Sequence, residues 1–202
     1  MMLQRIIEYF RPPPLRDSGA LFDFLGAEAA YLAQRTTYEF CRNTLSYYGQ
    51  HHFGDDGFNR VFAVSRWEAF AAILADLFVL AESRLRAAAP AQQLADPLLS
   101  GFGRALDAYP RPAHRAEGWG DVMDALRVRL QDAGAAAPAS PVVLAKVAAR
   151  RIYDTLPLYS QNKPADRQGI ARAVQFGMVA IDERLVDRLD SAGVVADLLR
   201  TP

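Results

Sequence analysis

The stretch Ala69–Ala81, AFAAILADLFVLA, is the most apolar segment of the 202-residue chain and decides its fold class. A helix that crosses a bilayer needs about 20 consecutive apolar residues, and this stretch is shorter. It also contains Asp76 and is flanked by Glu68 and Glu82. The sequence therefore predicts a buried core helix here and not a membrane crossing.

The overall composition indicates a globular chain. Hydrophobic residues make up 51% and charged residues 23%, which excludes an intrinsically disordered protein. Lys plus Arg and Asp plus Glu number 23 each, so the zero net charge argues against a strongly basic nucleic-acid binder. Cys41 is the one cysteine, so no intrachain disulfide is expected. The first ten residues do not resemble a signal peptide, and the predicted location is the cytoplasm.

Helical spacing of apolar residues extends outward from this stretch through most of the chain, and no convincing strand is found. Capping and proline signals predict helices over about 20–48, 65–89, 97–109, 121–133, 141–156 and 164–189, with a short turn at 191–199. Asp17 or Ser18 is expected to cap the first of these, and Ser65 and Glu68 form a capping box for the second. The prediction is an all-α fold, a bundle of about four long and two or three short helices.

No boundary divides the chain, so we expect a single domain over residues 1–202. Residues 1–16 are interpreted as an amphipathic segment followed by a proline linker, and 134–139 as a candidate hinge. The apolar face of the first segment is expected to dock onto the bundle or onto a partner. Weak contact of residues 1–11 with an anionic membrane surface is the alternative.

The best-defined polar feature is a stripe on the first long helix. At about 100° per residue, Glu28, Arg35, Glu39 and Arg42 fall on one side, and the tyrosines Tyr31 and Tyr38 lie beside them. Charges of alternating sign at this spacing are typical of a solvated helix face. The functional interpretation is a polar line inside a cavity, where these six residues would bind a ligand.

Motifs for known chemistry are missing. The sequence contains no G-x-S-x-G elbow, no pair of Glu-x-x-His motifs and no phosphate-binding loop. His51, His52, Asp55 and Asp56 are weak candidates for metal ligands, and we favour a polar turn between two helices. No cofactor is predicted.

Three hypotheses about function remain open. The leading one is a non-enzymatic binding protein, homodimeric through apolar faces left over on its long helices, because such faces must be covered. The second is a bundle with an internal pocket for a hydrophobic small molecule, such as a lipid, an isoprenoid or an aromatic metabolite, with or without catalysis. The third is a ligand-sensing transcriptional regulator, although no DNA-reading helix is recognised.

Overall fold

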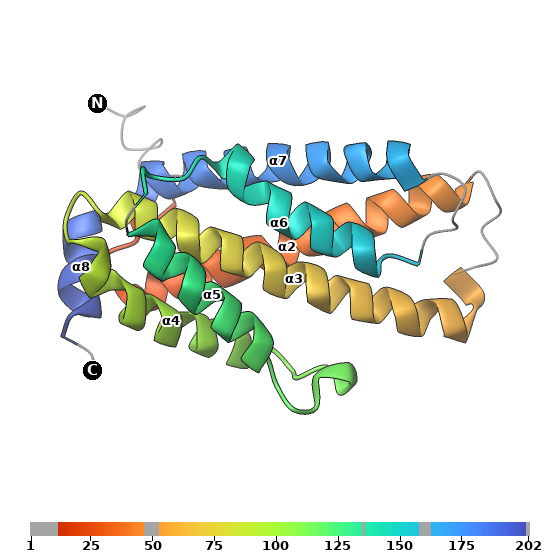
Figure 1. The fold of residues 1–202 in the computed structure, drawn as a ribbon, viewed down its shortest axis with the longest axis horizontal. Helices are drawn as coiled ribbons and strands as arrows, with labels where there is room; N and C mark the ends of the chain where they lie inside the picture. The colour runs from red at the N-terminus through yellow and green to blue at the C-terminus, as the bar shows by residue number, and fades with distance from the viewer. Residues whose placement is uncertain (1–11, 47–52, 135, 158–162, 201–202) are drawn as a thin grey trace, which may run out of the picture.

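The computed structural model describes residues 12–46, 53–134, 136–157 and 163–200, and these residues form an all-α bundle (Figure 1). The helices are α2 (Ser18–Ser46), α3 (Asp56–Leu85), α4 (Ala91–Asp107), α5 (Gly120–Ala133), α6 (Pro141–Thr155), α7 (Lys163–Arg188) and α8 (Ser191–Leu198), with a 3-10 turn at Ala113–Arg115. No strand is found within the described ranges. The predicted fold class is confirmed, with three helices of 26 to 30 residues and three of 14 to 17.

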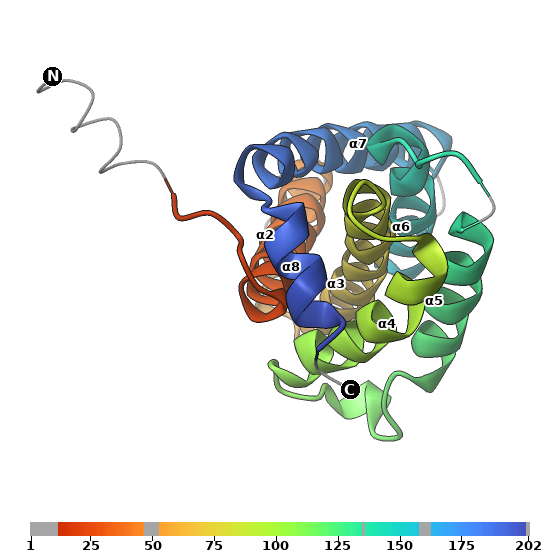
Figure 2. The same cartoon turned by 90° about the vertical axis from the view of Figure 1, so that its left-hand side faces the viewer.

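Helix α3 is the centre of the bundle. It packs against each of the other six described helices, and Figure 2 shows them arranged around it. Every residue from Ile73 to Ser83 is buried, so this part of α3 has no solvent-facing side. The apolar surplus of the central stretch is therefore covered by shorter helices of the same chain.

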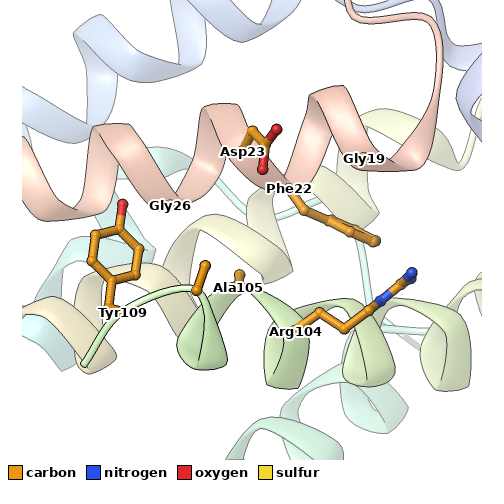
Figure 3. A pocket seen from close by; sticks show the side chains of 8 residues that line it. Gly19, Phe22, Asp23, Gly26, Arg104, Ala105 and Tyr109 are labelled. Atoms are coloured by element: carbon orange, nitrogen blue, oxygen red, sulfur yellow. The ribbon is translucent and has the colours of Figure 1, made fainter. Parts of the chain in front are cut away.

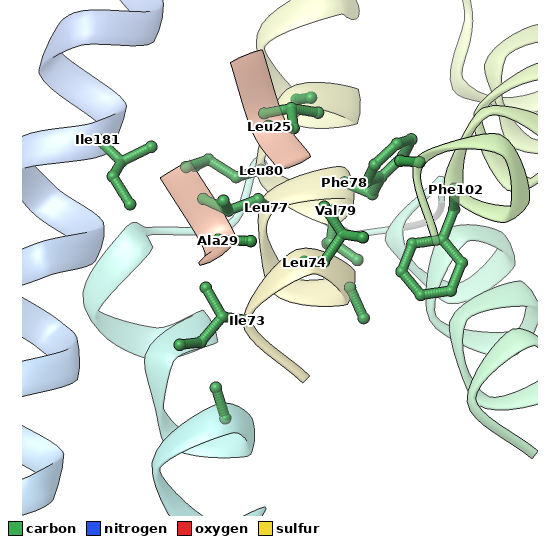
Figure 4. Packing of buried hydrophobic residues seen from close by; sticks show 14 of the residues in the cluster. Leu25, Ala29, Ile73, Leu74, Leu77, Phe78, Val79, Leu80, Phe102 and Ile181 are labelled. Atoms are coloured by element: carbon green, nitrogen blue, oxygen red, sulfur yellow. The ribbon is translucent and has the colours of Figure 1, made fainter. Parts of the chain in front are cut away.

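The core is built on leucine and phenylalanine side chains of α3 (Figure 4). Phe78 is fully buried and lies between two other rings, stacked on Phe22 of α2 at 5.4 Å and edge-on to Phe102 of α4 at 5.5 Å. Aromatic pairs at these separations add to the free energy of burial itself. They fix the positions of α2 and α4 on one side of α3.

The predicted start of the second long helix is wrong. The helix begins at Asp56 and not near Ser65, because the side chain of Asp55 accepts a hydrogen bond from the backbone of Phe58 at 2.7 Å. Ser65 and Glu68 lie inside the helix and are buried. Their capping-box spacing is coincidental, since both side chains face other helices.

The predicted start of the next helix is also wrong. Helix α4 begins at Ala91, and Pro97 lies inside it. A proline there leaves the carbonyl of Gln93 without its helical donor, and Gln93 is exposed to water. By contrast, Asp17 accepts from the backbone of Ala20 at the start of α2, and α6 begins with Pro141, as the sequence predicts.

Two predicted connecting segments have contacts in the fold. Leu15, in the proline linker, is buried, and its backbone exchanges hydrogen bonds with Arg188 and Asp190 between α7 and α8. In the linker from α5 to α6, the carbonyls of Ala133 and Ala136 accept from Arg86 at the end of α3. Residues 1–11, with their predicted docking or membrane contact, lie outside the described residues.

None of the helices in the described ranges has the combined length and apolar character that crossing a membrane requires.

Candidate functional site

A groove of about 480 Å³ runs between α2 and α4 on the surface of the bundle (Figure 3). This volume lies in the range of small-molecule sites. Its lining residues are Gly19, Phe22, Asp23, Gly26, Arg104, Ala105, Ala108 and Tyr109.

The groove exists because both helices present small residues to each other. Gly19 and Gly26 lie two turns apart on α2, and Ala105 and Ala108 lie one turn apart at the end of α4. A Cβ atom on Gly26 would lie 3.5 Å from the hydroxyl of Tyr109, so the glycine leaves a space that a side chain would fill. The result is a slot that opens to solvent.

A cation lies at one end of the slot. The guanidinium of Arg104 lies 5.1 Å from the centre of the Phe22 ring, and Figure 3 shows the two side chains together. Cation–π contact of this kind holds a guanidinium in place without neutralising it. The positive charge of Arg104 helps to lower the pKa of Asp197 on α8, so the two groups lie close enough to interact electrostatically.

A phenol lies at the other end of the slot. The ring of Tyr109 packs against Phe70 of α3 at 4.8 Å, and its hydroxyl points toward α2 beside Gly26 (Figure 3). Partial burial, and then the nearby carboxylate of Asp23, raise the pKa of Tyr109 above its usual value. The hydroxyl is therefore protonated at neutral pH and can donate a hydrogen bond into the groove.

A second polar feature lies deep in the fold, where α3 carries three buried carboxylates. Glu68 accepts hydrogen bonds from both sides of the Arg115 guanidinium at 2.7 and 2.8 Å, and also from Arg151 of α6 and His114. Burial acts to raise the pKa of Glu68, but the hydrogen bonds from these three groups outweigh it and lower the pKa to about 2. Glu68 is therefore charged and fully paired.

The other two buried carboxylates of α3, Asp76 and Glu82, are also paired with arginines. Asp76 is fully buried and accepts from Arg129 of α5 and from the backbone of Ala148 of α6. Burial raises its pKa to about 6, although Arg129 opposes the shift. Glu82 is also fully buried and forms a two-pronged ion pair with Arg86 at 2.6 and 2.8 Å.

These buried carboxylates link neighbouring segments of the chain to α3. Glu68 and Asp76 each bind groups from two or more surrounding segments, and Glu68 and the Arg129 partner of Asp76 line a groove of about 220 Å³ between α3, α5 and α6. Each arginine in this groove already has a carboxylate partner, so its charge is neutralised. The arrangement accounts for how α5, α6 and the 3-10 turn are held on α3, and it leaves no free charge for a ligand.

The structure places the predicted ligand-binding stripe on the outer surface of α2. Tyr31, Tyr38 and Arg42 are exposed, and Arg35 and Glu39 pair with each other at 3.3 Å with about half of each side chain exposed. Glu28 is partly buried and forms a two-pronged ion pair with Arg184 of α7. The stripe thus faces water, and the expected position inside an enclosed cavity is not what the structure shows. Arg35 and Glu39 do border a surface groove between α2 and α7.

The weak metal candidates are only partly described. Asp55 caps α3, Asp56 lies in the first turn of that helix, and both are exposed. His51 and His52 lie outside the described residues. Among the residues that the structure describes, no group of three or more metal-ligating side chains comes together.

Sequence reasoning missed the groove residues Asp23, Arg104 and Tyr109, which carried no motif. A signal did exist for the buried carboxylates, because Asp76 interrupts the most apolar stretch of the chain and Glu68 and Glu82 flank it. A charge within such a stretch requires a partner. Which arginine supplies it depends on packing between helices.

Comparisons with protein-family models, with curated proteins and with solved structures find no match for this chain.

Proposed function

We propose that the chain is a non-enzymatic helical binding protein that holds a small aromatic carboxylate in the groove between α2 and α4. The observation that carries this proposal is the guanidinium of Arg104, which is held on Phe22 at the end of a groove of about 480 Å³. A guanidinium in that setting can bind a carboxylate through two parallel hydrogen bonds.

The walls of the groove favour a flat apolar body. Phe22 and Tyr109 offer rings at its two ends, and glycines and alanines line the space between them. A planar ring enters such a slot without requiring side chains to move. It would also make offset or edge-on contacts with the two aromatic residues.

The remaining polar groups narrow the choice of ligand. The protonated hydroxyl of Tyr109 can donate to an acceptor at the far end of the ring. Asp23 is exposed and negatively charged beside the groove, so a second acidic group on the ligand would be repelled. We therefore expect a monoanion to bind more tightly than a dianion.

A binding role fits the lining better than a catalytic one. Its eight residues include no serine, cysteine, histidine or lysine, which are the commonest nucleophiles and bases of covalent catalysis. The cytoplasm is the proposed compartment. Cys41 is buried, and burial raises the pKa of its thiol to about 12, so little of it is present as the reactive thiolate at neutral pH.

The experiment is a titration of the full chain with 2-naphthoate, followed by isothermal calorimetry and by saturation-transfer NMR. Replacement Arg104→Gln should weaken binding about 10- to 100-fold, the range expected for charge-assisted hydrogen bonds. Replacement Arg172→Gln, which removes an exposed arginine on α7, is the matched control and should leave the affinity unchanged.

Two further arms test the shape and charge of the site. Neutral 2-naphthamide should bind weakly and equally to the wild type and to Arg104→Gln. Replacement Gly26→Leu should abolish binding, because the new side chain would fill the slot beside Tyr109. The proposal fails if no aromatic monocarboxylate binds at millimolar concentration, or if Arg104→Gln binds 2-naphthoate as tightly as the wild type.

A further inference from the structure

A different surface, formed by α2 and α7, has features that suit a second protein copy. We name it the α2/α7 face and define it by Tyr31, Arg35 and Glu39 of α2 with Ala173 and Phe176 of α7. Phe176 is 76% exposed and Tyr31 is 61% exposed, the two highest values among the large exposed hydrophobic residues of the described chain. Figure 2 shows α2 and α7 as neighbours at the edge of the bundle.

A groove of about 380 Å³ lies directly beside the exposed phenylalanine. One wall comes from α2 with Leu32 and Phe40, and the other from α7 with Gly169, Ala173 and Gly177, spaced four residues apart. The small side chains of α7 keep this wall low, and a Cβ on Gly177 would lie 2.3 Å from a methyl carbon of Leu32. The α2/α7 face therefore carries an aromatic projection and an apolar recess side by side.

We infer that this face forms a two-fold homodimer in which Phe176 of each copy enters the groove of the other. In a two-fold interface the same patch meets itself, so a surface with both a projection and a recess can be complementary to its own copy. Exposed aromatic residues that enter a recess on the partner are the usual energetic centre of such contacts.

The charges on the α2/α7 face also favour a second copy of the chain as the partner. Arg35 and Glu39 lie one turn apart on α2, and about half of each side chain is exposed. When two α2 helices meet antiparallel about a two-fold axis, Arg35 of one copy lies opposite Glu39 of the other. The formal net charge of the chain is zero, so two copies approach without overall repulsion.

The two helices that carry the face are long enough for a dimer contact. Helices α2 and α7 have 29 and 26 residues, which corresponds to lengths of about 40 Å. A strip two helices wide, at about 10 Å per helix, covers roughly 800 Å² over that full length, so a contact of the usual size extends along both helices beyond the five residues that define the face. A bilayer surface is a less suitable occupant, since Arg35, the cation among the five residues that define the face, is paired with Glu39.

The test is sedimentation velocity of the full chain between about 1 and 100 μM, at or above the dissociation constants of interfaces of this size, which are about micromolar or tighter. The wild type should sediment at twice the chain mass of 22.3 kDa. Replacement Phe176→Asp should raise the dissociation constant about 30-fold or more. Replacement Val128→Asp, at another exposed apolar residue on α5, should leave it unchanged and serves as the matched control.

A charge exchange distinguishes a second copy from any other occupant. Arg35→Glu and Glu39→Arg should each weaken self-association, because like charges then meet across the two-fold axis. Mixing the two variants should restore a dimer, since each carries the charge that the other lacks. A wild type that stays monomeric at 100 μM overturns the inference. The inference is also overturned if Phe176→Asp leaves the dimer intact. It is overturned as well if a monomeric chain binds phosphatidylcholine–phosphatidylglycerol vesicles through Phe176.

Discussion

Replacing Glu68 by glutamine tests whether the buried carboxylates of α3 hold the bundle together. The substitution keeps the size of the side chain and removes its charge. Glu68 accepts hydrogen bonds from Arg115, Arg151 and His114 and is almost fully buried. In Glu68→Gln the guanidinium groups of Arg115 and Arg151 lose this counter-charge, and Arg115, which keeps its ion pair with Asp121, is largely buried; removal of one partner from a buried ion pair is strongly destabilising.

The magnitude follows from the pKa of Glu68. Its partners lower this pKa from 4.5 to about 2, which corresponds to roughly 3 kcal/mol of stabilisation of the folded state by the charged form. Removal of one partner from a buried ion pair typically costs about 3–5 kcal/mol, and we take this as the expected range. For a chain of this length, that loss lowers the melting temperature by roughly 10 °C.

The assay is urea unfolding at pH 7, followed by circular dichroism at 222 nm. Glu117→Gln is the control. Glu117 lies in the connection between α4 and α5 that also contains Arg115, but its side chain is exposed, so the substitution should change stability by less than about 0.5 kcal/mol. The pH dependence gives a second readout. Because the folded pKa lies below the unfolded one, the contribution of Glu68 is present above pH 4.5 and is lost as the pH falls toward 2.

The difference in the free energy of unfolding between wild type and Glu68→Gln should therefore shrink as the pH is lowered from 4.5 toward 2. The reasoning is refuted if Glu68→Gln loses less than about 1 kcal/mol with an unchanged dependence on urea concentration, because the loss of charge-assisted hydrogen bonds to a buried carboxylate should exceed that amount. It is also refuted if the difference between the two proteins stays constant from pH 5 to pH 3.

Two other substitutions test the electrostatics and packing of the same core. Asp76 has a folded pKa of about 6, raised from 3.8, so its contribution is present below pH 4 and is lost as the pH rises to 6. In urea unfolding, the free energy of unfolding of the wild type should fall by about 3 kcal/mol across this window, and that of Asp76→Asn should not. The assignment is contradicted if the free energies of the two proteins change with pH in parallel. A Cβ on Gly101 would lie 2.2 Å from the Phe22 ring, so Gly101→Ala should destabilise the fold by roughly 1–3 kcal/mol, measured by thermal unfolding. Gly103→Ala is the control and should be neutral or slightly stabilising, because the nearest atom to its new Cβ belongs to Met123 at 3.7 Å. Equal effects of Gly101→Ala and Gly103→Ala would contradict the close packing of Gly101 against Phe22.

Local signals in the sequence predicted much of the fold. The apolar stretch Ala69–Ala81 predicted a buried helix, and it lies at the centre of the bundle. Asp17 and Pro141 predicted helix starts within a few residues, because capping depends on atoms close in the chain. Ser65 and Glu68 matched a capping box and were misread, since the pattern alone does not reveal that both side chains are buried against other helices.

The candidate sites were much less predictable. The stripe that includes Arg35 and Glu39 could be drawn from the sequence, but its exposure to water depended on where α7 packs. The groove between α2 and α4 joins Asp23 to Arg104 and Tyr109, which lie far apart in the chain and share no motif. No spacing rule connects such residues.

The sequence by itself determined that this chain forms helices and that one of them must be buried, because helix periodicity and apolar content are local properties. The tertiary structure alone decided which arginine meets which buried carboxylate, where two helices leave a groove, and which aromatic side chains stay exposed. These outcomes depend on how side chains from distant segments fill space around α3, and that packing is a property of the assembled bundle and not of any one segment.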